Sequence, residues 1–350
     1  NFIETHIEGV EKKFEFGVGY DRFANHIMKM GSLALMAPSS AIKNLISGNI
    51  QKTIEAVGGK TINAESLTKG EYIFDSKFIP NMVKDTYSLT KSLETQMMQL
   101  FDPQISFGDE VGNIANASLK RDAVDLKFLL GAQKMGEIHI QGSSAVSMLH
   151  FQQVPYVNEQ GEKSQIRYLD AWEIQDGIIQ LKPGVDKDWD KDGNSFAQFK
   201  LRMQKVNELL QGAYAKENQA EYQRYTNGKL AGFMRRFFAP MLMNRWMFER
   251  ANYATGEYRE GYYQTFIRLA ADMIKTKGEN YQYYNEEEKR NALKTLAEIG
   301  YSMMFMALIS LLGWDDDDED KYDKLQEMPW IQSFTIYELM LIKSETETFI

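Results

Sequence analysis

Apolar residues recur every three or four positions through most of this 350-residue chain, the spacing of an amphipathic helix. In the first half the pattern predicts one helix that starts near Asp21 and a second that starts after Pro38 and ends at Gly58-Gly59. A third is expected over about 80–101, and a longer one, kinked at its glycines, over 119–152. After Ser195 it predicts further helices over 196–210, 222–238, 241–254, 261–276, 286–314 and 331–343.

The period changes between these two helical halves. Residues that favour β-structure cluster at 154–157, 166–169, 172–174 and 178–181, and Asp176-Gly177 separates the last two runs. Asp-Gly between short apolar runs is typical of a β-hairpin. We therefore predict a mainly α fold, a multi-helix assembly with one small β-hairpin insertion near 165–181. The chain divides into a helical region over 1–152, a hairpin and acidic loop over 153–194, and a helical region over 195–350, together read as a fragment of a longer polypeptide.

Composition narrows the possible chemistry. The chain is 43% hydrophobic and 25% charged, as in folded proteins rather than disordered ones. It contains no cysteine, which excludes disulfides, thiol nucleophiles and cysteine-bound zinc or iron–sulfur clusters. Six of the nine excess negative charges lie in one run, over 315–320, so a local anionic partner remains compatible with the rest. The four histidines are scattered, which leaves carboxylates as the plausible metal ligands.

An acidic loop is the sharpest local motif. Asp188, Asp190 and Asp192, followed by Gly193, match the first, third, fifth and sixth positions of an EF-hand loop. The twelfth position, which needs a bidentate Glu, is Phe199. Ca²⁺ binding, Mg²⁺ binding of the kind used by two-barrel RNA polymerases, and a metal-free turn that caps the next helix are all open. The turn is favoured, so no cofactor is expected, and no catalytic constellation is visible.

A basic segment, and an apolar one described next, have compositions that allow binding. Basic residues interleave with aromatic ones in a strip of Lys229, Arg235, Arg236, Arg245 and Arg250, which could meet phosphates or a membrane interface. The alternative, which we favour, is packed helices whose arginines pair with acids. Gly142-Ser143-Ser144 is interpreted as small residues at a helix contact.

Sixteen residues without a charge, 299–314, form the most apolar stretch of the chain. A bilayer span needs about 20 apolar residues. We therefore favour a buried central helix over a short membrane insertion.

A block of sequence in the second half carries a resemblance. Val206-Asn207-Glu208-Leu209-Leu210-Gln211-Gly212-Ala213-Tyr214 is followed by Phe233-Met234-Arg235-Arg236-Phe237-Phe238-Ala239-Pro240, and later by Glu260-Gly261-Tyr262-Tyr263 and 341–348. Over about 165–350 the chain resembles the large virion-associated proteins of crAss-like bacteriophages. These motifs carry no known chemistry, so the resemblance assigns no catalytic residue.

The resemblance implies a cargo role. Such proteins accompany a virion RNA polymerase, are stored in the capsid or tail, and are ejected with the genome into the host. The expected partners are other virion proteins (tail, portal or fellow cargo), with DNA or the host membrane as further contacts during ejection and no small-molecule substrate. Part of a virion polymerase that uses the acidic loop, or a membrane-inserting segment, are the alternatives.

Overall fold

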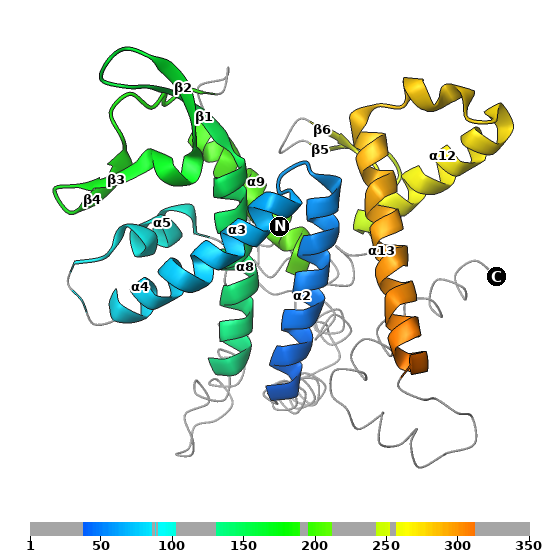
Figure 1. Cartoon of the computed structure of the whole chain (residues 1–350), viewed down its shortest axis with the longest axis horizontal. Coiled ribbons are helices and arrows are strands. Elements are labelled where there is room, and N and C mark those ends of the chain that lie inside the picture. The colour runs from blue at the N-terminus through cyan, green and yellow to red at the C-terminus, as the bar shows by residue number, and fades with distance from the viewer. Residues whose placement is uncertain are drawn as a thin grey trace, which may run out of the picture.

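The computed structural model of the chain describes residues 38–85, 88, 90–102, 131–189, 195–211, 243–252 and 257–311 (Figure 1). This part is mainly α-helical, as the periodicity predicts. It contains eight α-helices and three two-stranded antiparallel sheets.

The N-terminal helices are α2 (Pro38–Gly58), α3 (Ala64–Ile73), α4 (Ile79–Lys84) and α5 (Leu93–Phe101), and a π-helical turn, η2 (Phe74–Phe78), joins α3 to α4. Gly59 ends α2 as predicted, with a φ of 65° that favours glycine. The single helix predicted over 80–101 is wrong. The carboxylate of Asp85 accepts hydrogen bonds from the backbone and hydroxyl of Ser92, and that hydroxyl caps α5. These local bonds compete successfully with a continuous helix.

The centre of the fold is α8 (Gly131–Phe151), in which every residue from 140 to 150 is buried. It packs against α2 and α3, and small residues allow the close approach (Figure 1). A Cβ on Gly70 would lie 2.5 Å from the Cα of Ser147, and one on Gly142 would lie 2.3 Å from the Phe74 ring. The predicted small-residue helix contact at 142–144 is thereby confirmed.

The inserted region holds two hairpins where we predicted one. The expected one joins β3 (Trp172–Gln175) to β4 (Ile178–Leu181), and it turns at Asp176 and Gly177, both with positive φ. The other joins β1 (Gln153–Val157) to β2 (Lys163–Arg167). Its longer turn contains no Asp-Gly pair. The turn is closed instead by the Asn158 side chain, whose oxygen accepts hydrogen bonds from the backbone N–H groups of Gln160 and Glu162.

The helix predicted over 241–254 is wrong as well. Residues 243–246 form one helical turn, after which β5 (Arg250–Asn252) pairs with β6 (Glu257–Arg259). The backbone N–H of Gly261 donates to the carbonyl of Met247, 2.7 Å away, which draws the chain back on itself where a helix would continue.

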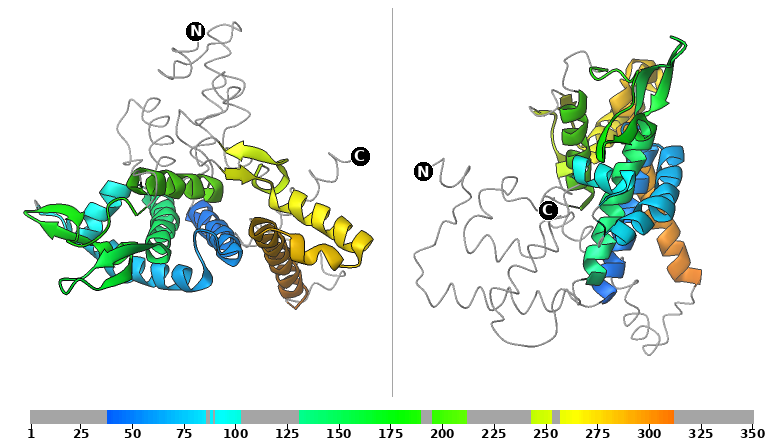
Figure 2. Two further views of the ribbon diagram at one scale, coloured as in Figure 1. Left: turned by 90° about the horizontal axis from the view of Figure 1, so that it is seen from above. Right: turned by 90° about the vertical axis from the view of Figure 1, so that its left-hand side faces the viewer.

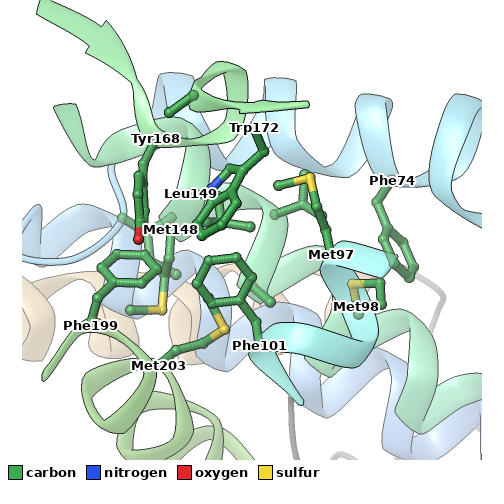
Figure 3. Close-up of a cluster of buried hydrophobic side chains, with 14 of the residues drawn as sticks. Phe74, Met97, Met98, Phe101, Met148, Leu149, Tyr168, Trp172, Phe199 and Met203 are labelled. Atoms are coloured by element: carbon green, nitrogen blue, oxygen red, sulfur yellow. The ribbon is translucent and has the colours of Figure 1, made fainter. Parts of the chain in front are cut away.

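Aromatic side chains from distant segments fill the core around α8 (Figure 3). Tyr168, in the 3₁₀ turn η4 (Tyr168–Ala171), and Trp172 bring the hairpin region into contact with Phe101, at ring-centroid distances of 5.9 and 5.6 Å. Phe199 of α9 (Ser195–Gln211) lies 5.2 Å from Tyr168. The stripe predicted on α9 is confirmed. The core draws on all three regions of the sequence, whose boundaries at 152 and 194 stay a prediction.

A separate helical hairpin lies on the other side of α2 (Figure 2). It consists of α12 (Tyr262–Thr276), a 3₁₀ turn η7 (Glu279–Tyr283) and α13 (Glu286–Leu311). Both helices start where the sequence predicts. Figure 2 places α13 beside α2, with α12 alongside α13.

Candidate functional site

The α12–α13 hairpin has a polar interior. The guanidinium of Arg245, just before β5, is buried and forms an ion pair with the carboxylate of Glu298 on α13, donating through Nε at 3.1 Å. The other carboxylate oxygen accepts from the Tyr262 hydroxyl at 2.5 Å. The guanidinium carbon also lies 5.7 Å from the centroid of the Tyr262 ring, within the range of a cation–π contact.

Neighbouring polar side chains complete this interior. Asn291 of α13 donates to the hydroxyl of Thr265 on α12 at 3.0 Å, and the Thr295 hydroxyl donates to the carbonyl of Tyr262 at 3.0 Å. Gly261 lets the chain pass close by, since a Cβ there would lie 2.4 Å from the carbonyl oxygen of Arg245. Buried polar groups that are paired in this way stabilise one specific helix arrangement.

The pKa values of Tyr262 in this cluster and of Arg268 on α12 are both raised. Burial, with the Glu298 carboxylate nearby, raises the pKa of Tyr262 well above its usual range, so the phenol keeps its proton and donates it. Hydrogen bonds from Arg268 to Glu260 raise the pKa of that guanidinium further. At neutral pH, therefore, the Tyr262 phenol and the Arg268 guanidinium keep their protons and act as hydrogen-bond donors.

The outer surface of the same hairpin is apolar. On α13, Leu293, Leu296, Ile299 and Met303 are 42–66% exposed, although Asn291, Lys294, Thr295 and Glu298 between them are buried. On α12, Ile267, Met273 and Ile274 are exposed. On α13 the usual distribution of side chains is thus inverted, although α12 still buries Leu269. An exposed apolar surface of this kind is typical of a protein contact.

A second buried cation links three helices at α8. The ammonium of Lys52, on α2, is fully buried and donates to Glu71 of α3 at 2.6 Å and to the Ser143 hydroxyl of α8 at 2.7 Å. Burial lowers the pKa of Lys52, which the Glu71 carboxylate opposes. At the edge of this cluster, Nε2 of His139 lies 3.0 Å from Asp75 in the π-helical turn.

The Lys52 cluster resembles a Ser–Lys pair in composition but not in setting. Ser143 lies within α8, where its hydroxyl also donates to the carbonyl of Ile140, and Lys52 has a carboxylate partner that favours its charged form. Within the helix, backbone N–H groups are already used and cannot stabilise an oxyanion. The arrangement is suited to joining three helices.

A third buried pair attaches the hairpin to the rest of the described fold. Lys294 of α13 lies 2.7 Å from Glu55 of α2, and both side chains are largely buried. Gly58 makes room for the lysine, because a Cβ there would lie 2.3 Å from its Cε. Lys60 and Glu287 add a more exposed pair at 3.0 Å. Charged groups therefore define how α13 sits on α2.

The predicted metal loop is only partly within the described residues, which exclude Asp190 and Asp192. Asp188 is exposed, and its backbone N–H donates to the Asp186 carboxylate at 3.0 Å. The next residue, Trp189, packs on Tyr168 at 5.9 Å, which ties the segment to the core. Across the described ranges, no three histidine or acidic side chains gather as metal ligands.

Arg245 does not belong to an exposed basic strip. Arg245 is 1% exposed and paired with Glu298, so the expectation of an exposed anion-binding side chain is wrong there. The alternative of an arginine paired with an acid holds because burial requires a counter-charge. Lys229, Arg235 and Arg236 lie outside the described residues, and of Arg250 only the backbone, in β5, is described.

The apolar stretch at 299–314 continues α13 through Leu311. Ile299 and Met303 are exposed, so for these residues the prediction of a buried central helix is wrong. Among the described helices, none has the length and apolar character needed to cross a bilayer.

The sequence interpretation missed Lys52, Glu71, Glu298 and Lys294. No local signal marks these residues, because a charged residue in a helical pattern does not identify a partner that lies up to 239 positions away. Comparison of the chain with protein-family models, curated proteins and solved structures finds no match.

Proposed function

We propose that this chain is a structural, non-enzymatic segment of a large phage virion protein, packaged in the capsid or tail and ejected with the genome. The resemblance over 165–350 motivates the phage assignment. The observation that supports a structural role is a set of three ion pairs with a buried cation, Lys52–Glu71, Glu55–Lys294 and Arg245–Glu298, each of which joins separate segments.

Such pairs are useful to a chain that unfolds and refolds. A cargo protein that passes a narrow channel must afterwards select its correct helix partners, and a buried charge penalises a wrong partner more strongly than an apolar side chain does. The chain has no cysteine, so refolding needs no disulfide exchange. Ion pairs and packing re-form spontaneously.

The partners we propose are other virion proteins, and α12 offers them a surface. Ile267 and Ile274 lie seven positions apart, on one side of the helix, and both are exposed. Ile178, an isoleucine on β4 that is 70% exposed, provides a matched control position.

The test is to locate the chain during infection. Mass spectrometry of purified particles should detect it, and fractionation of infected cells should find it inside before new synthesis. Its absence from particles would overturn the proposal. With the chain present, Ile274→Asp should reduce incorporation several-fold and Ile178→Asp should not; equal incorporation of both would exclude the α12 surface.

A further inference from the structure

The outward side of α13 carries a row of apolar side chains, here named the α13 strip: Leu293, Leu296, Ile299, Met303 and Met304. Apart from the two adjacent methionines they recur every three or four positions, so they lie along one side of the helix. Each is 42–66% exposed, whereas Lys294 and Glu298, which pair with Glu55 and Arg245, are buried. The strip is therefore the side of α13 opposite to its contacts with the rest of the described fold.

The α13 strip is apolar without a charge along it. From residue 293 to residue 304, all of which the structure describes, Lys294 and Glu298 are the charged side chains, and both are used in ion pairs on the inward side. A strip of this kind has no charge with which to attract a nucleic acid or an acidic peptide. It is, however, complementary in character to itself, and a second copy of the chain carries the same strip.

The exposed area of the strip is that of a weak dimer contact. A Leu, Ile or Met side chain carries roughly 100 Å² of apolar surface, so a half-exposed one offers about 50 Å². Five such residues on each of two copies would bury about 500 Å², and because apolar atoms make up a little over half of an interface, the total would be near 900 Å². Interfaces of this size belong to transient complexes. The strip is therefore large enough for a reversible contact between two copies.

The charges at the start of α13 favour an antiparallel arrangement of the two helices. The first turn of α13 contains Glu286, Glu287 and Glu288. A parallel pair would place these glutamates beside their own copies, whereas an antiparallel pair places them at opposite ends and opposes the two helix dipoles. With the two-fold axis near Ile299, in the middle of the strip, Leu293 of each copy lies toward Met304 of the other. A contact of this symmetry closes after two copies.

We propose that two copies of the chain associate through the α13 strip, antiparallel to each other and about a two-fold axis near Ile299. The two methionines suit such a contact, because their unbranched side chains adapt to the surface that they meet. The association is independent of the proposed phage role, since it needs this chain alone. The α12 surface proposed for other virion proteins lies on a different helix, so each contact is tested without the other.

Analytical ultracentrifugation of the full chain over a concentration series tests the association. The wild-type chain should pass from monomer to dimer over roughly 1–100 μM, the range of transient complexes. Leu296→Lys should raise the dissociation constant at least tenfold, because it would place a charge within the apolar contact. The matched control, Ile274→Lys at a position that is 81% exposed on α12, should leave the constant within about twofold. A wild-type chain that stays monomeric, or an equal effect of both variants, would overturn the proposal.

Cross-linking between copies tests the orientation, and the chain has no native cysteine to interfere. Ile299→Cys places a thiol of each copy near the two-fold axis, so a short bis-maleimide should join the two copies. In Leu293→Cys the two thiols would be separated by about 18 Å along the helices and should be joined several-fold more slowly. Equal rates for the two variants would indicate a parallel contact and would contradict the proposed arrangement.

Discussion

The two regions that flank α2, the core around α8 and the α12–α13 hairpin, are packed with different kinds of side chain. On one side, the core around α8 consists of aromatic and apolar side chains, with Phe101 in contact with four other rings. On the other, the interior between α12 and α13 is built from Arg245, Glu298, Asn291 and Thr295, with Tyr262 among them. The apolar residues of α13 lie outside, although α12 buries Leu269.

This difference separates stability from specificity. Apolar packing gains free energy in proportion to buried area and tolerates many exchanges of similar volume. A polar interior gains little net free energy but fails when a single partner is removed. The aromatic core therefore supplies most of the stability, and the α12–α13 hairpin depends on exact pairing.

The largest effect is expected from Phe101→Ala. The ring is 1% exposed at the centre of the aromatic core, and its removal leaves a cavity that costs about 3–5 kcal/mol. Chemical denaturation followed by circular dichroism measures the change. Phe248→Ala, at a ring that is 75% exposed, serves as the control and should shift the free energy of unfolding by less than about 0.5 kcal/mol. Equal losses would refute the placement of the core.

Removing one partner of the polar interior should cost slightly less. Arg245→Met strands the buried Glu298 carboxylate, and we expect a loss of about 3 kcal/mol in the free energy of unfolding. The double variant Arg245→Met with Glu298→Gln removes both charges, keeps an oxygen that accepts from the Tyr262 hydroxyl, and should recover most of this loss. If the double variant is less stable than the single one, the pair stabilises the hairpin directly rather than selecting its arrangement.

Two helical glycines sharpen the comparison of the two regions. Gly70→Ala brings a methyl within 2.3 Å of the Ser147 hydroxyl at the α3–α8 contact and should cost about 2 kcal/mol. Gly300→Ala, on α13, meets open space and should stabilise by about 0.5–1 kcal/mol through helix propensity. Thermal denaturation distinguishes the two, and a destabilising Gly300→Ala would place a neighbour against α13 at that position.

The smallest expected effect is a dependence of stability on pH through His150, in the region around α8. Burial, together with Arg167 and Lys69, lowers the pKa of His150 on α8. In the unfolded chain His150 takes up a proton near pH 6.5, and in the folded chain it does so at lower pH. The contribution of His150 to stability is therefore constant above pH 6.5 and decreases below it. The midpoint of urea denaturation should fall between pH 7.5 and 5.5, and by less in His150→Gln. If the midpoint falls by the same amount in His150→Gln as in the wild-type protein, another group titrates.

Local patterns proved sufficient for most helices and for one hairpin. The α9 stripe and the starts of α12 and α13 follow from apolar spacing, and the Asp176-Gly177 turn follows from two residues that accept positive φ. The failures have local causes that a pattern does not weigh. Asp85 and Ser92 interrupt a stripe that reads as continuous, and the hydrogen bond of Gly261 to Met247 replaces a predicted helix by β-structure.

The candidate site lay further from prediction. Periodicity alone places an apolar stripe inside, whereas on α13 the apolar residues lie outside and Lys294 and Glu298 inside. The basic strip likewise included Arg245 because its neighbours are basic and aromatic, although its partner is 53 residues away.

The sequence alone determined the helical character of the chain, the hairpin turn and the exclusion of cysteine chemistry, because each depends on residues close together or on composition. The tertiary structure alone decided which charges are buried and with which partner, as in Glu55 and Lys294, and which side of α13 faces inward. Burial and ion pairing depend on surfaces that meet only after folding, and a one-dimensional pattern carries no record of them.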